Sequence, residues 1–142
     1  MNDFPILVVR LIIKNAQNKV LILQRAESEY AGGSWCLPGG KVKYGDTVEQ
    51  SAARELKEET SLICHSLRFL FYQDSLPLKP GGMHCVNFYF EAEVSGDIML
   101  NEESCHFEWI GLSDLENYNI AYRNDTALIH YWKKTPGYIL HG

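Results

Sequence analysis

Residues 37–62 read LPGGKVKYGDTVEQSAARELKEETSL, a glycine pair followed by a segment in which three glutamates crowd together. Thr47 and Gln50 match a capping box, in which each side chain bonds the backbone N–H of the other residue. The following ARELKEE consists almost wholly of good helix formers. A helix opened by Thr47 is therefore predicted, preceded by a glycine-rich loop over residues 31–45.

The acidic residues of this helix are Glu55, Glu58 and Glu59, which fall within an arc of about 100° at about 100° per residue. Like charges at this spacing destabilise a helix, so a cation is expected beside them. Mg²⁺ usually takes one or two protein carboxylates, with water and phosphate oxygens at its other positions. The alternative is a solvated acidic face, but the glycine loop, which can fold back over the helix N-terminus, favours a metal site.

Strands are predicted on both sides of this helix. Two aliphatic runs, 6–13 and 19–25, flank a polar turn and predict a β-hairpin. Further strands are predicted over 67–72, 85–94 and 107–110, Ser113 is expected to cap a short turn or helix, and 125–133 predicts a closing helix. This order predicts an α+β fold, a mixed sheet flanked by helices, in a single domain over residues 1–142.

Composition and charge argue against several classes of function. A chain of 142 residues with 46% hydrophobic residues can bury one core, and a net charge of −5 argues against nucleic-acid binding. Arg10 interrupts the longest apolar run, which resembles neither a signal peptide nor a membrane span. The scattered cysteines contain no CxxC pair, so reduced thiols are expected: Cys36, Cys64, Cys85 and Cys105. A cytoplasmic protein without nucleic-acid or membrane partners is predicted.

At the quoted residues the sequence resembles the Nudix (MutT-type) hydrolase family, whose box reads G-x5-E-x7-R-E-U-x-E-E-x-G-U, with U a bulky apolar residue. Gly40 opens the box and Leu62 closes it, with Arg54 and Glu55 as the RE pair and Glu58 and Glu59 as the EE pair. The preceding LPG also looks like the approach to this box. The resemblance implies the compact Nudix fold, an α/β/α sandwich around a mixed sheet.

Two positions depart from the family pattern. Asp46 stands at the first glutamate of the box and keeps its charge with one methylene less reach, so a direct metal or Arg54 contact is not carried over. Ser61 stands where a glycine would end the helix in a left-handed conformation, at an expected cost of about 1 kcal/mol.

The resemblance implies a Mg²⁺-dependent enzyme, with Mn²⁺ as an alternative ion, that hydrolyses the diphosphate linkage of a nucleoside diphosphate derivative. The implied metal ligands are Glu55, Glu58, Glu59 and the Gly39 carbonyl, for which a simple turn glycine is the alternative. Arg54 is implied to hold a glutamate of the cluster through a bidentate pair; the alternative is a solvated pair with Glu58.

A further carboxylate, a metal ligand or general base, is implied outside the box. Glu103 lies six residues before Trp109, as the corresponding glutamate does in MutT-type members. Glu102 and Glu108 are rivals, and a solvated loop acid is the alternative.

Substrate contacts are expected from three residues. Arg25 ends a strand before the loop and can contact phosphate or ribose; the alternative is that it forms a surface ion pair. Trp35 can stack on a base, as can Tyr30, Tyr72 and Phe88; the alternative is that these aromatic side chains belong to the core. Asn124 matches the position where MutT-type proteins use an asparagine on guanine, although Asn124 or Asp125 also suits a helix cap. His84 is a weaker candidate, more typical of a satisfied or exposed histidine.

The leading hypothesis is a pyrophosphohydrolase of a (d)NTP or modified (d)NTP, giving NMP and pyrophosphate. A hydrolase of ADP-ribose or another nucleotide sugar is the alternative, mildly disfavoured because no N-terminal extension is evident. A non-catalytic nucleotide-binding module would be expected to lose an RE or EE carboxylate, and all are present. A structural protein with an incidental acidic helix does not explain the glycine loop. The expected partner is a small nucleotide, and the expected state a monomer or homodimer.

Overall fold

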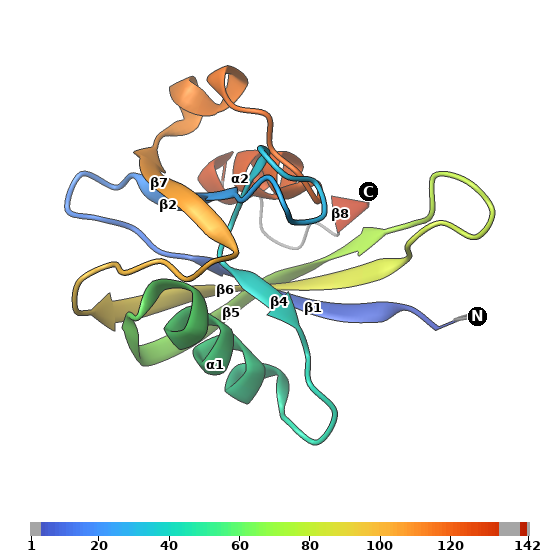
Figure 1. The fold of residues 1–142 in the computed structure, drawn as a ribbon, viewed down its shortest axis with the longest axis horizontal. Coiled ribbons are helices and arrows are strands. Elements are labelled where there is room, and N and C mark those ends of the chain that lie inside the picture. The colour runs from blue at the N-terminus through green and yellow to red at the C-terminus, as the bar shows by residue number, and fades with distance from the viewer. Residues whose placement is uncertain (1–3, 134–139, 142) are drawn as a thin grey trace.

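The computed structural model describes residues 4–133 and 140–141, whose strands form two sheets (Figure 1). The first sheet has five strands in the order β4 (Gly39–Lys41), β1 (Ile6–Ile12), β6 (Cys85–Ser95), β5 (Ile63–Ser75) and β8 (Leu140–His141). It is mixed, because β1 pairs with β6 and β5 with β8 in parallel, whereas its other pairs are antiparallel. The second sheet is antiparallel, in the order β3 (Trp35–Cys36), β2 (Val20–Arg25) and β7 (Ser104–Ile110).

Helices cover the two faces of this β layer. Helix α1 (Val48–Thr60) lies on one side and α2 (Asn124–Lys133) on the other, with a 3₁₀ helix, η1 (Leu112–Asn117), before α2 (Figure 1). Each side has its own core: Ala52 and Leu56 of α1 pack in one cluster, and Ala127 and Leu128 of α2 in the other. The predicted mixed sheet flanked by helices is confirmed.

The predicted hairpin between the first two runs is present only as a short junction. Lys14 bridges Val20, and the Asn15 N–H donates to the Lys19 carbonyl at 3.0 Å. Beyond this junction the prediction is wrong, because β1 and β2 enter different sheets. Each is the middle strand between two other partners, so neither has a free edge for the other. Both also send side chains into both cores, which explains their nearly continuous apolar sequence.

The helix ends follow local chemistry. Thr47 caps α1, accepting from the Gln50 N–H at 3.0 Å, while the Gln50 side chain accepts from the Thr47 N–H at 2.8 Å, as predicted. The predicted Ser113 cap is wrong: Gly111 precedes η1, and its N–H donates to Asp114 at 2.9 Å. Strands β5 and β7 are longer than predicted. No helix in the described part of the chain has both the length and the apolar character needed to cross a membrane.

Candidate active site

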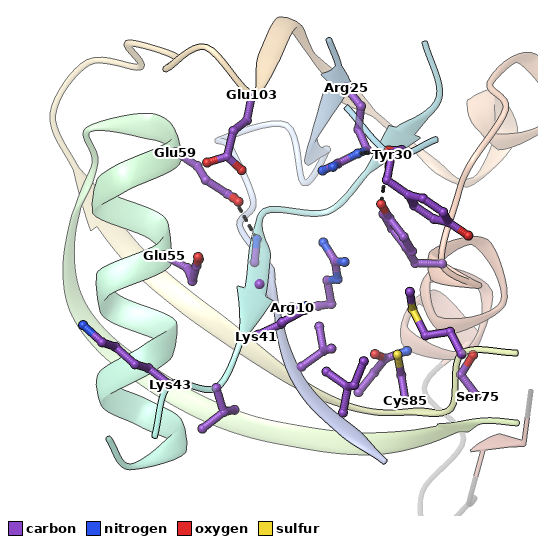
Figure 2. Close-up of a pocket in the computed structure, with 18 of the residues that line it drawn as sticks. Arg10, Arg25, Tyr30, Lys41, Lys43, Glu55, Glu59, Ser75, Cys85 and Glu103 are labelled. Carbon is purple, nitrogen blue, oxygen red and sulfur yellow. Dashed lines mark hydrogen bonds between the residues drawn. The ribbon is translucent and has the colours of Figure 1, made fainter. Parts of the chain in front are cut away.

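A cavity of about 780 Å³ lies beside β1 and β4, a volume that suits a nucleotide-sized ligand. One part of its lining is acidic, with Glu55 and Glu59 of α1 and Glu103 from the segment before β7. Another part is basic, with Arg10 of β1 and Arg25 of β2. Figure 2 shows the three carboxylates at the α1 side and the arginines toward Tyr30. Three of the predicted acids, all except Glu58, are therefore brought together with the predicted substrate arginine, Arg25.

The glycine pair lies between β1 and the carboxylates of α1. The Gly39 N–H donates to Glu59 Oε1 at 2.9 Å, as the dashed line in Figure 2 marks. A Cβ on Gly39 would stand 1.9 Å from the Val9 carbonyl oxygen, and a Cβ on Gly40 would stand 2.4 Å from Glu55 Oε2. The absence of both side chains thus lets β4 approach β1 and lets Glu55 reach the cavity.

Glu59 is held in an environment that disfavours its charge. Its side chain is buried, and burial raises its pKa to about 8 even though the Gly39 N–H and the charge of Arg10 both lower it. The charges of Glu55 and Glu103 raise it further. A carboxylate in this position gains from additional positive charge.

Glu55 shares this environment. Burial raises its pKa, Arg54 lowers it, and the charges of Glu58 and Glu103 raise it. Its Oε2 atom is buried and has no hydrogen-bond partner. An acceptor oxygen of this kind is a suitable ligand for a cation.

The donor set fits a hard divalent cation. Among the described residues no three His, Cys, Asp or Glu side chains form a ready-made metal cluster. Mg²⁺ nevertheless needs only one or two protein carboxylates, which Glu55 and Glu59 supply. Both are oxygen donors, and one of them has an unpartnered oxygen. Glu103 adds a third negative charge close enough to affect both.

Glu58 lies outside this arrangement. Its side chain is 55% exposed and contacts Arg54, whose Nη1 is 3.4 Å from Glu58 Oε1. Arg54 also approaches Glu55 at 3.7 Å and Asp46 at 3.5 Å, so it contacts three carboxylates instead of forming one bidentate pair. Asp46 therefore reaches Arg54 despite its shorter side chain. Arg54, which also lines the cavity, is placed to orient Glu55.

Glu103 is the loop acid that lines the cavity. Its backbone carbonyl accepts from the Ala26 N–H at 2.9 Å, which ties the segment to the end of β2. Asn101 holds it as well, since its Oδ1 accepts from the Glu103 N–H at 3.0 Å. The rivals Glu102 and Glu108 are exposed and do not line the cavity.

Arg25 lines the cavity and also forms the ion pair that was its alternative. Its Nε donates to the Tyr30 carbonyl at 2.7 Å, and its Nη2 lies 3.6 Å from Glu29. Tyr30 lines the cavity too. The other aromatic candidates do not: Trp35 packs edge-on against Tyr118 with ring centroids 5.2 Å apart, and neither Tyr72 nor Phe88 is part of the lining.

Asn124 lies behind the cavity wall and is fully buried. Its Oδ1 accepts from the Leu37 N–H at 2.9 Å, and its Nδ2 donates to the Tyr122 carbonyl and the Tyr89 hydroxyl, each at 3.2 Å. The structure thus gives it internal partners on both ends of its amide. His84 is likewise absent from the cavity lining.

Sequence reasoning gave Arg10 and Tyr122 no role in the site, although both line the cavity. Arg10 was noted only as an interruption of an apolar run, although a charge at an inward-facing strand position is itself a signal. Tyr122 gave no signal, because it depends on two consecutive non-glycine residues, Tyr122 and Arg123, with positive φ angles of 59° and 58°.

The chain is similar in sequence to proteins of one known family. The chain matches the NUDIX domain model over residues 5–131. It is 31% identical to the ADP-ribose pyrophosphatase of Methanocaldococcus jannaschii, covering 91% of this chain and 75% of that protein. It is 29% identical to the 8-oxo-dGTP diphosphatase of Buchnera aphidicola, and the match covers 90% of this chain and 92% of that protein.

Other relatives are longer than this chain. A solved structure with low sequence identity also has a similar fold. The match spans 30% of the putative nudix hydrolase 1 of Caenorhabditis elegans and 29% of the mouse 8-oxo-dGDP phosphatase NUDT18. The crystal structure of the MutT protein from Methanosarcina mazei Go1 superposes with a TM-score of 0.82 at 22% identity, over 94% of this chain and 98% of that one. Fold, acidic helix and matched range together show that the chain belongs to the Nudix hydrolase family.

Proposed function

We propose that this protein is a Mg²⁺-dependent pyrophosphohydrolase that cleaves the diphosphate linkage of a nucleoside diphosphate derivative. One observation carries the proposal: Glu55 and Glu59 are partly or fully buried side by side at a nucleotide-sized cavity, with an unpartnered carboxylate oxygen. Burial is costly for carboxylates, and a bound divalent cation relieves this cost.

Each residue has a role in this proposal. Glu55 and Glu59 hold the metal, and the Gly39 N–H fixes the orientation of Glu59. Arg54 positions Glu55, while its other contacts, Asp46 and Glu58, hold Arg54 in place. Glu103 faces the same space and accepts the proton of the attacking water. The bound Mg²⁺ supplies positive charge that screens the phosphate oxygens and favours deprotonation of water. Glu58 and the Gly39 carbonyl remain predicted ligands.

The favoured substrate is a (d)NTP or modified (d)NTP, which gives NMP and pyrophosphate. The match to the Buchnera aphidicola protein named 8-oxo-dGTP diphosphatase, over 92% of its length, supports this choice. ADP-ribose or another nucleotide sugar is the second candidate, supported by the Methanocaldococcus jannaschii protein named ADP-ribose pyrophosphatase. The products separate the two, because a nucleotide sugar gives NMP and a sugar phosphate.

The test is a panel of (d)NTPs, oxidised (d)NTPs, ADP-ribose and nucleotide sugars, incubated with and without Mg²⁺, with products identified by mass. Glu55→Gln and Glu59→Gln are expected to lower kcat/KM by about 100-fold or more, since each removes a metal-binding charge. Glu49→Gln is the matched control, because Glu49 is exposed in the first turn of the same helix and does not line the cavity.

The control is expected to stay within about twofold of the wild type. Absence of any metal-dependent product across the panel would instead indicate a non-catalytic nucleotide-binding protein. Full activity in the Glu59→Gln variant would remove the proposed metal site.

A further inference from the structure

Arg10 is a buried cation in the wall of the cavity. Ile6, Val8 and Arg10 alternate along β1 and all line the cavity, whereas Val9 and Leu11, the neighbours of Arg10 in the chain, belong to the core beneath α1. Arg10 is only 7% exposed. Figure 2 shows its guanidinium in the middle of the site, between the carboxylates of α1 and Tyr30.

The hydrogen bond and the aromatic contact of Arg10 are both with uncharged groups. Arg10 Nη1 donates to the Leu37 carbonyl at 2.9 Å, and the guanidinium carbon lies 4.7 Å from the centroid of the Tyr122 ring. Its Nε is buried without a hydrogen-bond partner. Within the described residues it forms no ion pair with a carboxylate. A buried guanidinium without a counter-ion is costly, so a ligand is expected to supply the missing anion.

A network of hydrogen bonds holds the residues around Arg10. Leu37, which accepts from Arg10, is bonded through its N–H to Asn124, and Asn124 also binds the Tyr122 carbonyl. The next residue, Arg123, is held by Gln73, whose Nε2 donates to its carbonyl at 3.0 Å. These buried amides stabilise the two left-handed residues that bring the Tyr122 ring beneath Arg10.

Arg25 approaches the same ring. Its guanidinium carbon is 5.6 Å from the Tyr122 centroid, so two arginines share one aromatic platform. An arginine fork matches the oxygens of phosphate, and contact with the aromatic ring orients the planar guanidinium. Arg10 also lies close enough to Glu59 and Glu55 for its charge to affect both.

We propose that Arg10 binds a phosphate group of the substrate, the one on the far side of the scissile linkage from the carboxylates of α1. This inference deepens the proposed function and rests on it for the identity of the substrate. The site then has two poles: the metal-bound acids take one phosphate and the arginine pair takes the other. Preferred substrates are accordingly compounds with two adjacent anionic groups, and a single uncharged nucleoside is bound weakly.

A functional role for Arg10 also has a stability signature. Arg10→Met keeps much of the side-chain volume and removes the uncompensated charge. Replacing a buried charge by an apolar group of similar size is often neutral or stabilising. An arginine retained for folding alone would behave in the opposite way, so thermal unfolding separates the two roles.

The test measures binding of methylenediphosphonate, a non-hydrolysable diphosphate without a base, by calorimetry in the presence of Mg²⁺. Arg10→Met is expected to weaken binding by about 10- to 100-fold and Arg10→Lys by less, because lysine keeps the charge but loses the fork. The unfolding temperature of Arg10→Met is expected within about 3 °C of the wild type or above it. Arg68→Met is the matched control, since Arg68 is exposed on β5 and pairs with Glu91.

Several results would overturn the inference. Folded Arg10 variants that bind methylenediphosphonate like the wild type would do so, as would equal losses in Arg68→Met. Loss of adenosine and guanosine binding with the diphosphate unaffected would assign Arg10 to a base. If Arg10→Met does not fold, Arg10→Lys decides alone. Arg10-dependent diphosphate binding in a protein that hydrolyses no compound would sustain this inference while the proposed function fails.

Discussion

Gly39 and Gly40 are adjacent, yet each meets a different kind of neighbour. A side chain on Gly39 would strike the backbone of β1, with its Cβ 1.9 Å from the Val9 carbonyl oxygen and a φ angle of 154°. The three atoms nearest to a Cβ on Gly40 all belong to the carboxylate of Glu55, the far end of a flexible side chain. Gly39 therefore allows β4 to pack against β1, and Gly40 leaves room for the side chain of Glu55.

Substitution by alanine is expected to separate these two roles. Gly39→Ala should lower the free energy of unfolding by about 2 kcal/mol or more, because backbone must move. Gly40→Ala should cost less than about 1 kcal/mol but lower Mg²⁺-dependent hydrolysis at least about 10-fold, because Glu55 must turn away. Chemical denaturation and kcat/KM measure the two effects.

Gly45→Ala is the control for both glycine variants. Gly45 has a φ angle of +90° and open space around its Cβ position, so alanine there should cost about 1 kcal/mol and leave activity unchanged. A fully active Gly40→Ala variant would show that Glu55 does not need its present position.

At the scale of a single element, α1 is followed by a capping residue in a backbone conformation that this residue type disfavours. Ser61 has a φ angle of 66°, with its N–H donating to the Lys57 carbonyl at 3.0 Å. Its side chain donates to the Met99 carbonyl at 3.1 Å, which offsets part of the strain. The helix thus keeps the left-handed end that a glycine would provide at lower cost.

Ser61→Gly is therefore expected to raise the free energy of unfolding by up to about 1 kcal/mol, reduced by loss of the bond to Met99. Ser66→Gly is the control: Ser66 is exposed on β5 without a positive φ angle, and glycine there should destabilise by about 0.5 to 1 kcal/mol. Urea denaturation of the three proteins measures both changes. Equal destabilisation by the two substitutions would show that Ser61 is not strained.

The same helix shows what sequence can predict. Its cap depends on Thr47 and Gln50, three residues apart, and its acidic face on a spacing of three and four, so both follow from local sequence. The partners of β1 lie at least 29 residues away along the chain, which is why the predicted hairpin was mostly wrong. Arg10 and Tyr122 approach each other only after folding, so their contact was not predictable.

At the scale of the whole molecule, one carboxylate joins several parts of the fold. Glu91 on β6 accepts a hydrogen bond from Tyr131 of α2 and pairs with Arg68 of β5 at 2.6 Å and with Lys14 after β1 at 3.3 Å. Burial alone would raise its pKa, but the bonds from Tyr131 and Arg68 and the charge of Lys14 outweigh burial and hold the pKa at about 2. Docking of α2 on the sheet is thereby linked to pH.

Because the folded pKa of Glu91 lies below its ordinary value of 4.5, its contribution to stability is complete above pH 4.5 and disappears as pH falls toward 2. Glu91→Gln should therefore lower the free energy of unfolding by on the order of 1 to 2 kcal/mol at pH 7, and the difference from wild type should shrink steadily as the pH falls from about 4.5 toward 2. Glu93→Gln, at an exposed position two residues along β6, should change stability by less than about 0.5 kcal/mol throughout. Denaturant unfolding across this pH range makes the comparison, and a Glu91→Gln deficit that stays constant from pH 7 to pH 3 would mean that packing, and not charge, attaches α2 to the sheet.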